Sequence, residues 1–142
     1  MVSAGCEAFV LPEKLAAEGE FLKVENRIGR GVFAIMSVDG RPLAEASRLL
    51  LLHLTDSQRN KVKFSGEAMT QLESWGELPH LARRGEAEIM LKTPGNYKLY
   101  PVDTAGKRLT EIPLTRDGNS LRFPAKVFTP DGPVFAYELV RQ

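Results

Sequence analysis

The sequence predicts an all-β protein that folds as an antiparallel β-sandwich of about eight strands with one or two short helical turns. Polar and apolar residues alternate from about residue 21 onward, as they do in strands with one face in a core. Short strand-like segments near the C-terminus are separated by turns rich in glycine, aspartate and proline. Because 142 residues suffice for one hydrophobic core, we expect residues 1–142 to form a single domain.

The first third contains one weak helix signal and one strong strand signal. Residues 1–20 are expected to be an N-terminal extension or a first strand, with a short helix over 12–20. The glycines of 29–31 lack the spacing of a nucleotide-binding loop and predict a hairpin turn. Residues 31–39 alternate with apolar side chains on both faces, which predicts a strand covered on both sides. One face carries Val32, Ala34, Met36 and Val38, and the other carries Phe33 and Ile35.

The stretch 47-SRLLLLHLTDSQRN-60 brings His53, Asp56 and Ser57 close together in sequence, which raises the question of a hydrolase triad. A triad draws its members from distant segments, and the G-x-S-x-G nucleophile elbow is absent. We therefore interpret the stretch as a strand followed by a turn over 55–60 that Asp56 or Ser57 closes. Leu49, Leu51 and His53 are expected on one face of this strand, and Leu50, Leu52 and Leu54 on the other.

The second half predicts a short helical segment and then mostly strands. Residues 66–76 favour a turn or two of helix. Residues 86–92 alternate between apolar and charged side chains, which predicts a strand with one solvent-exposed face. Residues 96–142 predict a C-terminal β-meander, typical of an immunoglobulin-like sandwich. Its expected strands are 96–103, 107–114, 119–127 and 134–140. Proline at 101, 113 and 124 is expected at sheet edges, strand ends or bulges.

Composition argues against several classes of partner. A net charge of +1 gives no electrostatic reason to expect nucleic acid or an anionic membrane. There is no signal peptide or transmembrane run, so we expect a soluble chain of undetermined compartment. The single cysteine, Cys6, cannot form an internal disulfide, and His53 and His80 do not fit a metal-binding motif. No metal, cofactor or catalytic residue is predicted.

Trp75 is the first candidate for ligand binding. It lies between Glu73 and Glu77, and an aromatic face beside carboxylates can stack on a sugar ring while the acids accept its hydroxyl groups. Tyr100 is a further candidate for such a carbohydrate site. The alternative for a lone tryptophan is a plug in the core or in an interface. Tyr97 and Tyr137 are expected to be packed.

Four segments resemble the C-terminal β-sandwich that follows the catalytic barrel in some large bacterial glycoside hydrolases. They are 47-SRLLLLHLTDSQRN-60, 72-LESWGELPHLARRGEAEIMLK-92, 97-YKLYPVDTAGKRLTEIPL-114 and 121-LRFPAKVFTPDGPVFAYELV-140. The resemblance implies a non-catalytic accessory domain whose partner is the catalytic domain of a parent glycosidase. It also implies an exposed apolar surface where that domain packs. The alternatives are a carbohydrate-binding module that captures polysaccharide and, less favoured, an autonomous hydrolase.

Overall fold

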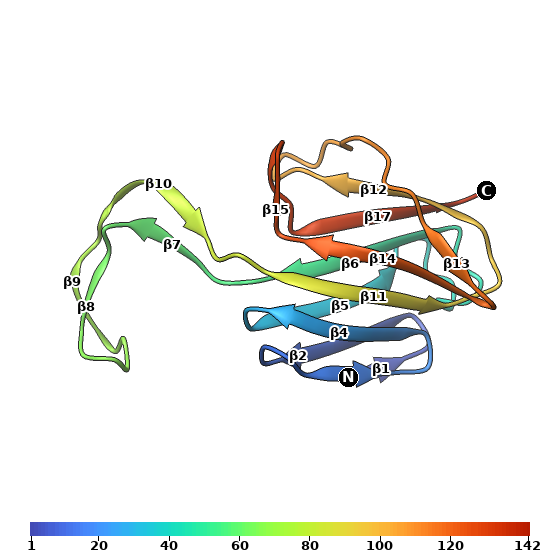
Figure 1. The fold of residues 1–142 in the computed structure, drawn as a ribbon, viewed down its shortest axis with the longest axis horizontal. Helices are drawn as coiled ribbons and strands as arrows, with labels where there is room; N and C mark the ends of the chain where they lie inside the picture. Colours follow the sequence, from blue (N-terminus) through green and yellow to red (C-terminus); the bar gives the residue numbers. More distant parts are fainter.

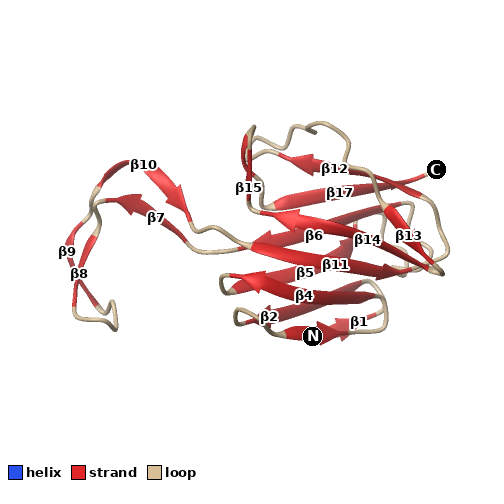
Figure 2. Cartoon of the chain, viewed as in Figure 1, coloured by secondary structure: helices blue, strands red, loops and turns tan.

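The computed structural model describes residues 1–142 and consists of strands without any helix (Figure 2). Two antiparallel sheets stack face to face, and a long hairpin, which we call the arm, projects from one end of them (Figure 1). The all-β sandwich predicted from the sequence is therefore confirmed, with more strands than the eight or so expected. The helical turns expected over 12–20 and 66–76 are wrong. Segments this short are poor helices alone, and residues from both ranges pair as strands instead.

The six-stranded sheet has the order β1-β2-β5-β6-β17-β12, and the five-stranded sheet has the order β13-β14-β11-β4-β3. In the first sheet the bounds are β1 Val2–Ser3, β2 Cys6–Leu11, β5 Gly31–Ser37, β6 Arg48–Leu54, β17 Ala136–Arg141 and β12 Tyr97–Val102. In the second they are β13 Thr115–Asp117, β14 Ser120–Lys126, β11 Glu86–Lys92, β4 Leu22–Ile28 and β3 Ala16–Glu18. A two-residue pair, β15 Phe128–Thr129 with β16 Gly132–Pro133, closes the loop between β14 and β17.

The expected C-terminal meander is not formed, because consecutive strands join different sheets. β12 and β17 pair with each other in the six-stranded sheet, whereas β14 pairs with β11 and β13 in the other. Residues 107–114 contribute only two isolated bridges, at Arg108 and Ile112, in place of the expected strand. The turn at 29–31 likewise carries the chain from one sheet to the other and is not a hairpin.

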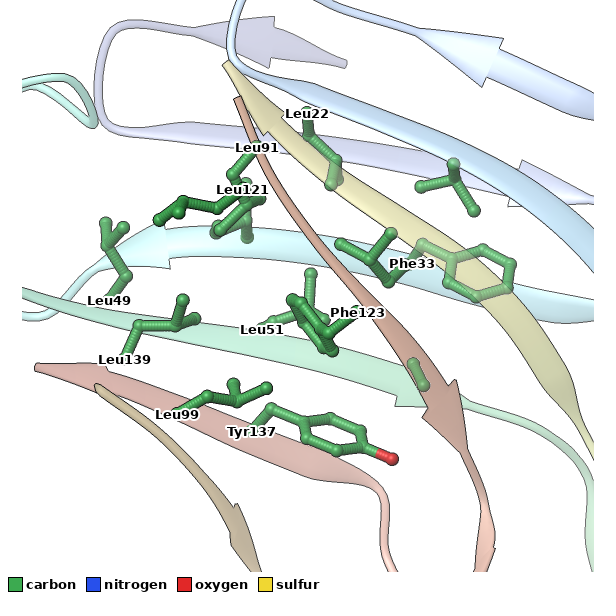
Figure 3. Close-up of a cluster of buried hydrophobic side chains, with 14 of the residues drawn as sticks. Leu22, Phe33, Leu49, Leu51, Leu91, Leu99, Leu121, Phe123, Tyr137 and Leu139 are labelled. Carbon is green, nitrogen blue, oxygen red and sulfur yellow. The ribbon is translucent and has the colours of Figure 1, made fainter. Parts of the chain in front are cut away.

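The core lies between the two sheets, where alternate side chains of facing strands meet (Figure 3). Leu49 and Leu51 of β6 and Ile89 of β11 are fully buried, as the alternation predicted. Tyr137 reaches across from β17, where its hydroxyl donates to the Lys126 carbonyl at 2.8 Å and accepts from the Lys126 N–H at 2.7 Å. Burial raises the pKa of this phenol to about 12. Tyr137 therefore links the six-stranded sheet to the five-stranded sheet by hydrogen bonds.

The arm comprises two successive pairs of strands between β6 and β11. Its bounds are β7 Ser57–Asn60, β8 Lys63–Ser65, β9 Gln71–Ser74 and β10 Glu77–Ala82, with β7 paired to β10 and β8 to β9. Part of the expected turn over 55–60 is therefore strand β7. Figure 1 shows the arm extending well beyond the sandwich.

Candidate functional site

The outer face of the six-stranded sheet is almost entirely apolar. Side chains alternate along each strand, so the residues between the core positions of β2, β5, β6, β17 and β12 point away from the second sheet. We call this surface the apolar face. Its apolar members are Cys6, Ala8, Val10, Val32, Ala34, Met36, Leu50, Leu52, Leu54, Tyr100, Val102, Ala136 and Val140. The charged exceptions are Arg48, Lys98 and Glu138.

The strand register arranges these side chains in continuous rows across the sheet. Val10 lies opposite Val32, which lies opposite Leu54, and all three are exposed, Val10 by 57%. The next row is Ala8, Ala34, Leu52, Ala136 and Val102. The third row is Cys6, Met36, Leu50, Glu138 and Tyr100. The apolar face is thus one patch, and the largest apolar patch of a protein is often a functional surface.

The outer face of the five-stranded sheet has the opposite character. Its outward positions on β4, β11 and β14 are mostly charged, and Met90 is the large apolar side chain among them. The charged members are Lys23, Glu25, Arg27, Glu86, Glu88, Lys92, Arg122 and Lys126. Several form ion pairs across the surface, such as Arg27 with Glu88 at 3.1 Å. The outer face of the five-stranded sheet is therefore hydrophilic, whereas the apolar face is suited to packing against another protein surface.

The sequence predicted that strand β5 would be covered on both sides, and here the structure differs. Phe33 and Ile35 pack in the core, but no segment of the chain lies over the partly exposed Val32 and Met36 on the other side. The alternation correctly identified two apolar faces. Only one of them is covered by this chain.

An ion cluster around Glu138 interrupts the apolar face. The Glu138 carboxylate is buried, and the Nε–H groups of Arg48 and Arg108 donate to its two oxygens. The hydrogen bond from Arg108 lowers the pKa of the Glu138 carboxyl most, and the bond from Arg48 lowers it further, so that this pKa lies below its usual range. The Arg108 guanidinium also lies 5.1 Å from the centre of the Tyr100 ring. The carboxylate is held charged in the middle of an apolar surface.

The arm leaves the sandwich beside the apolar face through a tightly bonded root. The Arg83 N–H donates to the Asp56 carbonyl at 2.8 Å, and the Thr55 hydroxyl donates to the Arg83 carbonyl at 2.7 Å. The same residues and one row of the apolar face line a hollow of about 510 Å³. Its lining includes Val10, Val32 and Leu54 together with Thr55, Asp56 and Arg83. The apolar face and the arm are therefore continuous surfaces.

The arm bends at a point where both of its strands take left-handed backbone conformations. Lys61 has φ of 58° and Gly76 has φ of 65°. A Cβ at position 76 would lie 2.3 Å from the Asn60 carbonyl oxygen, so glycine is required there. Next to this bend the Trp75 side chain projects into solvent and is 73% exposed. Met69, Leu78 and Leu81 add further exposed apolar side chains.

The structure separates the residues predicted for carbohydrate binding. Trp75, Glu73 and Glu77 lie together in the arm and are exposed, so a core position for Trp75 is wrong. Glu77 pairs with Lys61. Tyr100 instead belongs to strand β12 of the sandwich, where its hydroxyl donates to Glu111 at 3.2 Å. None of the surface hollows is lined by Trp75 or by Tyr100.

His53, Asp56 and Ser57 do not form a triad. His53 is fully buried, its ring is stacked on Phe33 with centroids 4.5 Å apart, and neither ring nitrogen has a hydrogen-bond partner. Burial lowers the pKa of His53 to about 4. Asp56 is exposed and pairs with Arg83 at 3.2 Å. His53 is therefore a core residue, as its place in the leucine alternation indicated.

Comparison of the chain with known protein families, with curated proteins and with solved structures found no match. No group of three or more histidine, cysteine or acidic side chains is placed to hold a metal ion. The chain forms no helix of the length and apolar character that crossing a membrane requires. The apolar face and the arm are thus the two features from which a function can be argued.

Proposed function

We propose that the chain is a non-catalytic accessory domain of a glycoside hydrolase, and that its apolar face packs against the catalytic domain of the same polypeptide. The observation that carries the proposal is the contrast between the two outer faces, one apolar and the other charged. Buried apolar area is the main favourable term in such packing. The glycosidase as parent rests on the sequence resemblance alone.

The size of the apolar face favours a tethered domain over a free partner. Five strands spaced about 4.8 Å apart, each contributing about 17 Å of length, give about 400 Å² on this side. Counting both surfaces, the contact would bury about 800 Å², which falls within the range of interfaces between domains of one chain. Stable complexes of separate proteins usually bury about 1,600 Å² in total.

The arm extends this contact in the proposed arrangement. A two-stranded hairpin without a core is marginal in water, and this one exposes Trp75, Leu78 and Leu81 along its length. The hollow at the root of the arm joins the arm to the apolar face. The arm therefore contacts the side of the domain that covers the apolar face. The charged five-stranded sheet remains in solvent.

A matched pair of substitutions tests the proposal in the full-length natural protein. Leu52 lies in the central row of the apolar face, and Met90 lies on the charged face between Lys23 and Arg122. Both Leu52→Asp and Met90→Asp place aspartate in a strand, so they share the same loss of β-propensity. In the isolated chain we expect each substitution to lower the free energy of unfolding by about 1 kcal/mol.

In the full-length protein the two variants should diverge. Leu52→Asp buries an unpaired carboxylate at the contact, which costs about 3 kcal/mol or more, and calorimetry should show the domains melting separately. Met90→Asp should melt like the wild type. Equal behaviour of the two variants, or a natural gene that encodes no glycosidase catalytic domain, would contradict the proposal.

Carbohydrate binding is the second candidate, and the exposure of Trp75 between two exposed acids favours it. An exposed indole can stack on a sugar ring while Glu73 accepts hydrogen bonds from its hydroxyl groups. Affinity electrophoresis in gels that contain single polysaccharides would retard the isolated chain, and Trp75→Ala would abolish the retardation. Equal mobility in every gel removes this candidate.

A further inference from the structure

The ion cluster on the apolar face has donors that the chain itself does not satisfy. Arg48 and Arg108 each use the Nε–H group to hold Glu138, and their Nη nitrogens make no hydrogen bond within the chain. Both arginine side chains are about half exposed, whereas the Glu138 side chain is only 6% exposed. Two guanidinium groups therefore keep exposed N–H groups on either side of the carboxylate that they already bind.

We infer that these two arginines bind a carboxylate of the covering domain. The surface of that domain in the contact is then apolar, with an acidic side chain placed opposite Arg48 and Arg108. This inference rests on the proposed function, because it describes the same contact. Covering the apolar face removes water from the Nη–H groups, and a buried donor without an acceptor is costly. The planar guanidinium fork matches a carboxylate, which can accept two of its N–H groups at once.

Charge also argues against a second copy of this chain as the cover. The cluster of two arginines and one glutamate carries a net charge of +1, whereas Lys98 at the edge of the face is paired with Glu111. The acids beside the same surface on a second copy, Glu138 and Glu111, are already paired with basic residues of their own chain. Two such faces would meet with like charges and with unpaired donors. A different surface that carries Asp or Glu satisfies both conditions.

The double variant Arg48→Lys/Arg108→Lys tests the inference. Lysine can still pair with Glu138, but its point charge lacks the second edge that a guanidinium presents. The isolated double variant should therefore melt as the wild-type chain does. Lys98→Gln is the matched control, because it alters charge on the same face at a residue whose partner, Glu111, belongs to this chain.

The measurement is carbodiimide-driven coupling of glycine ethyl ester to carboxylates in the full-length natural protein. In the wild type we expect at least one acid of the catalytic domain to be protected. It should react about tenfold faster in the double variant and in Leu52→Asp, and within twofold of the wild type in Lys98→Gln. An acid exposed by Leu52→Asp but not by the double variant overturns this inference and leaves the proposed function standing. If Leu52→Asp exposes no acid, the inference falls, and calorimetry of the same variant then decides the proposed function separately.

Discussion

His53 should make the stability of the sandwich depend on pH. Its ring lies in the core against Phe33, without hydrogen-bond partners, and burial lowers its pKa to about 4 from 6.5. The unfolded chain therefore binds a proton at a pH where the folded chain does not. The stability that this group confers is complete above about pH 6.5, and it is lost as the pH falls from there toward 4.

The size of the effect follows from the two pKa values. At about pH 7.5 both states carry neutral His53, so its contribution is intact. At about pH 5 the unfolded state is almost fully protonated while the folded state is not, which lowers the free energy of unfolding by about 2 kcal/mol. Below about pH 4 the loss levels off at about 3 kcal/mol.

Urea denaturation of the isolated chain and of His53→Leu at several pH values measures this loss. Leucine fills the same apolar site and does not titrate, and the carboxylates titrate equally in both proteins. The difference in free energy between the variant and the wild type should therefore grow by about 2 kcal/mol from about pH 7.5 to 5. His80→Gln, at an exposed site in the arm, should follow the wild type. A His53→Leu difference that does not change with pH would refute the burial argument.

Further predictions concern the link between the sheets and the arm. Tyr137→Phe should lower the free energy of unfolding by about 1–2 kcal/mol in chemical denaturation, because it leaves both backbone groups of Lys126 without their partner. Replacing residues 57–82 by Asn-Gly should change the stability of the sandwich by less than about 1 kcal/mol, since the arm contributes nothing to the hydrophobic core. Gly76→Ala should disturb amide signals of the arm alone in NMR spectra, because its Cβ would collide with Asn60.

The sequence predicted best those elements whose evidence is local. The alternation over 86–92 and over the leucine stretch places Ile89, Leu49 and Leu51 in the core, as the structure confirms. Strand partners were predicted poorly, because the sheet that a strand joins depends on distant segments. The expected meander fails for this reason: β12 and β13 follow each other in sequence but lie in different sheets.

The candidate site was only partly accessible from the sequence. The residues 31–37 have two apolar faces, but alternation cannot tell whether the second face is covered by the same chain or by another domain. The arm was missed because its alternation is short and interrupted at Lys61 and Gly76, where the backbone bends. The exposure of Trp75 was also unpredictable, since the same residue beside Glu73 fits a core, an interface or a ligand platform.

Methionine oxidation in the proposed parent protein and in the isolated chain tests most directly whether the apolar face is covered. Met36 lies on the apolar face and Met90 on the charged face, and both are partly exposed in the isolated chain. A docked apolar face predicts that peroxide oxidises Met36 at least tenfold more slowly in the full-length protein, while Met90 reacts equally in both. Equal reactivity of Met36 in the two proteins would contradict docking through this face.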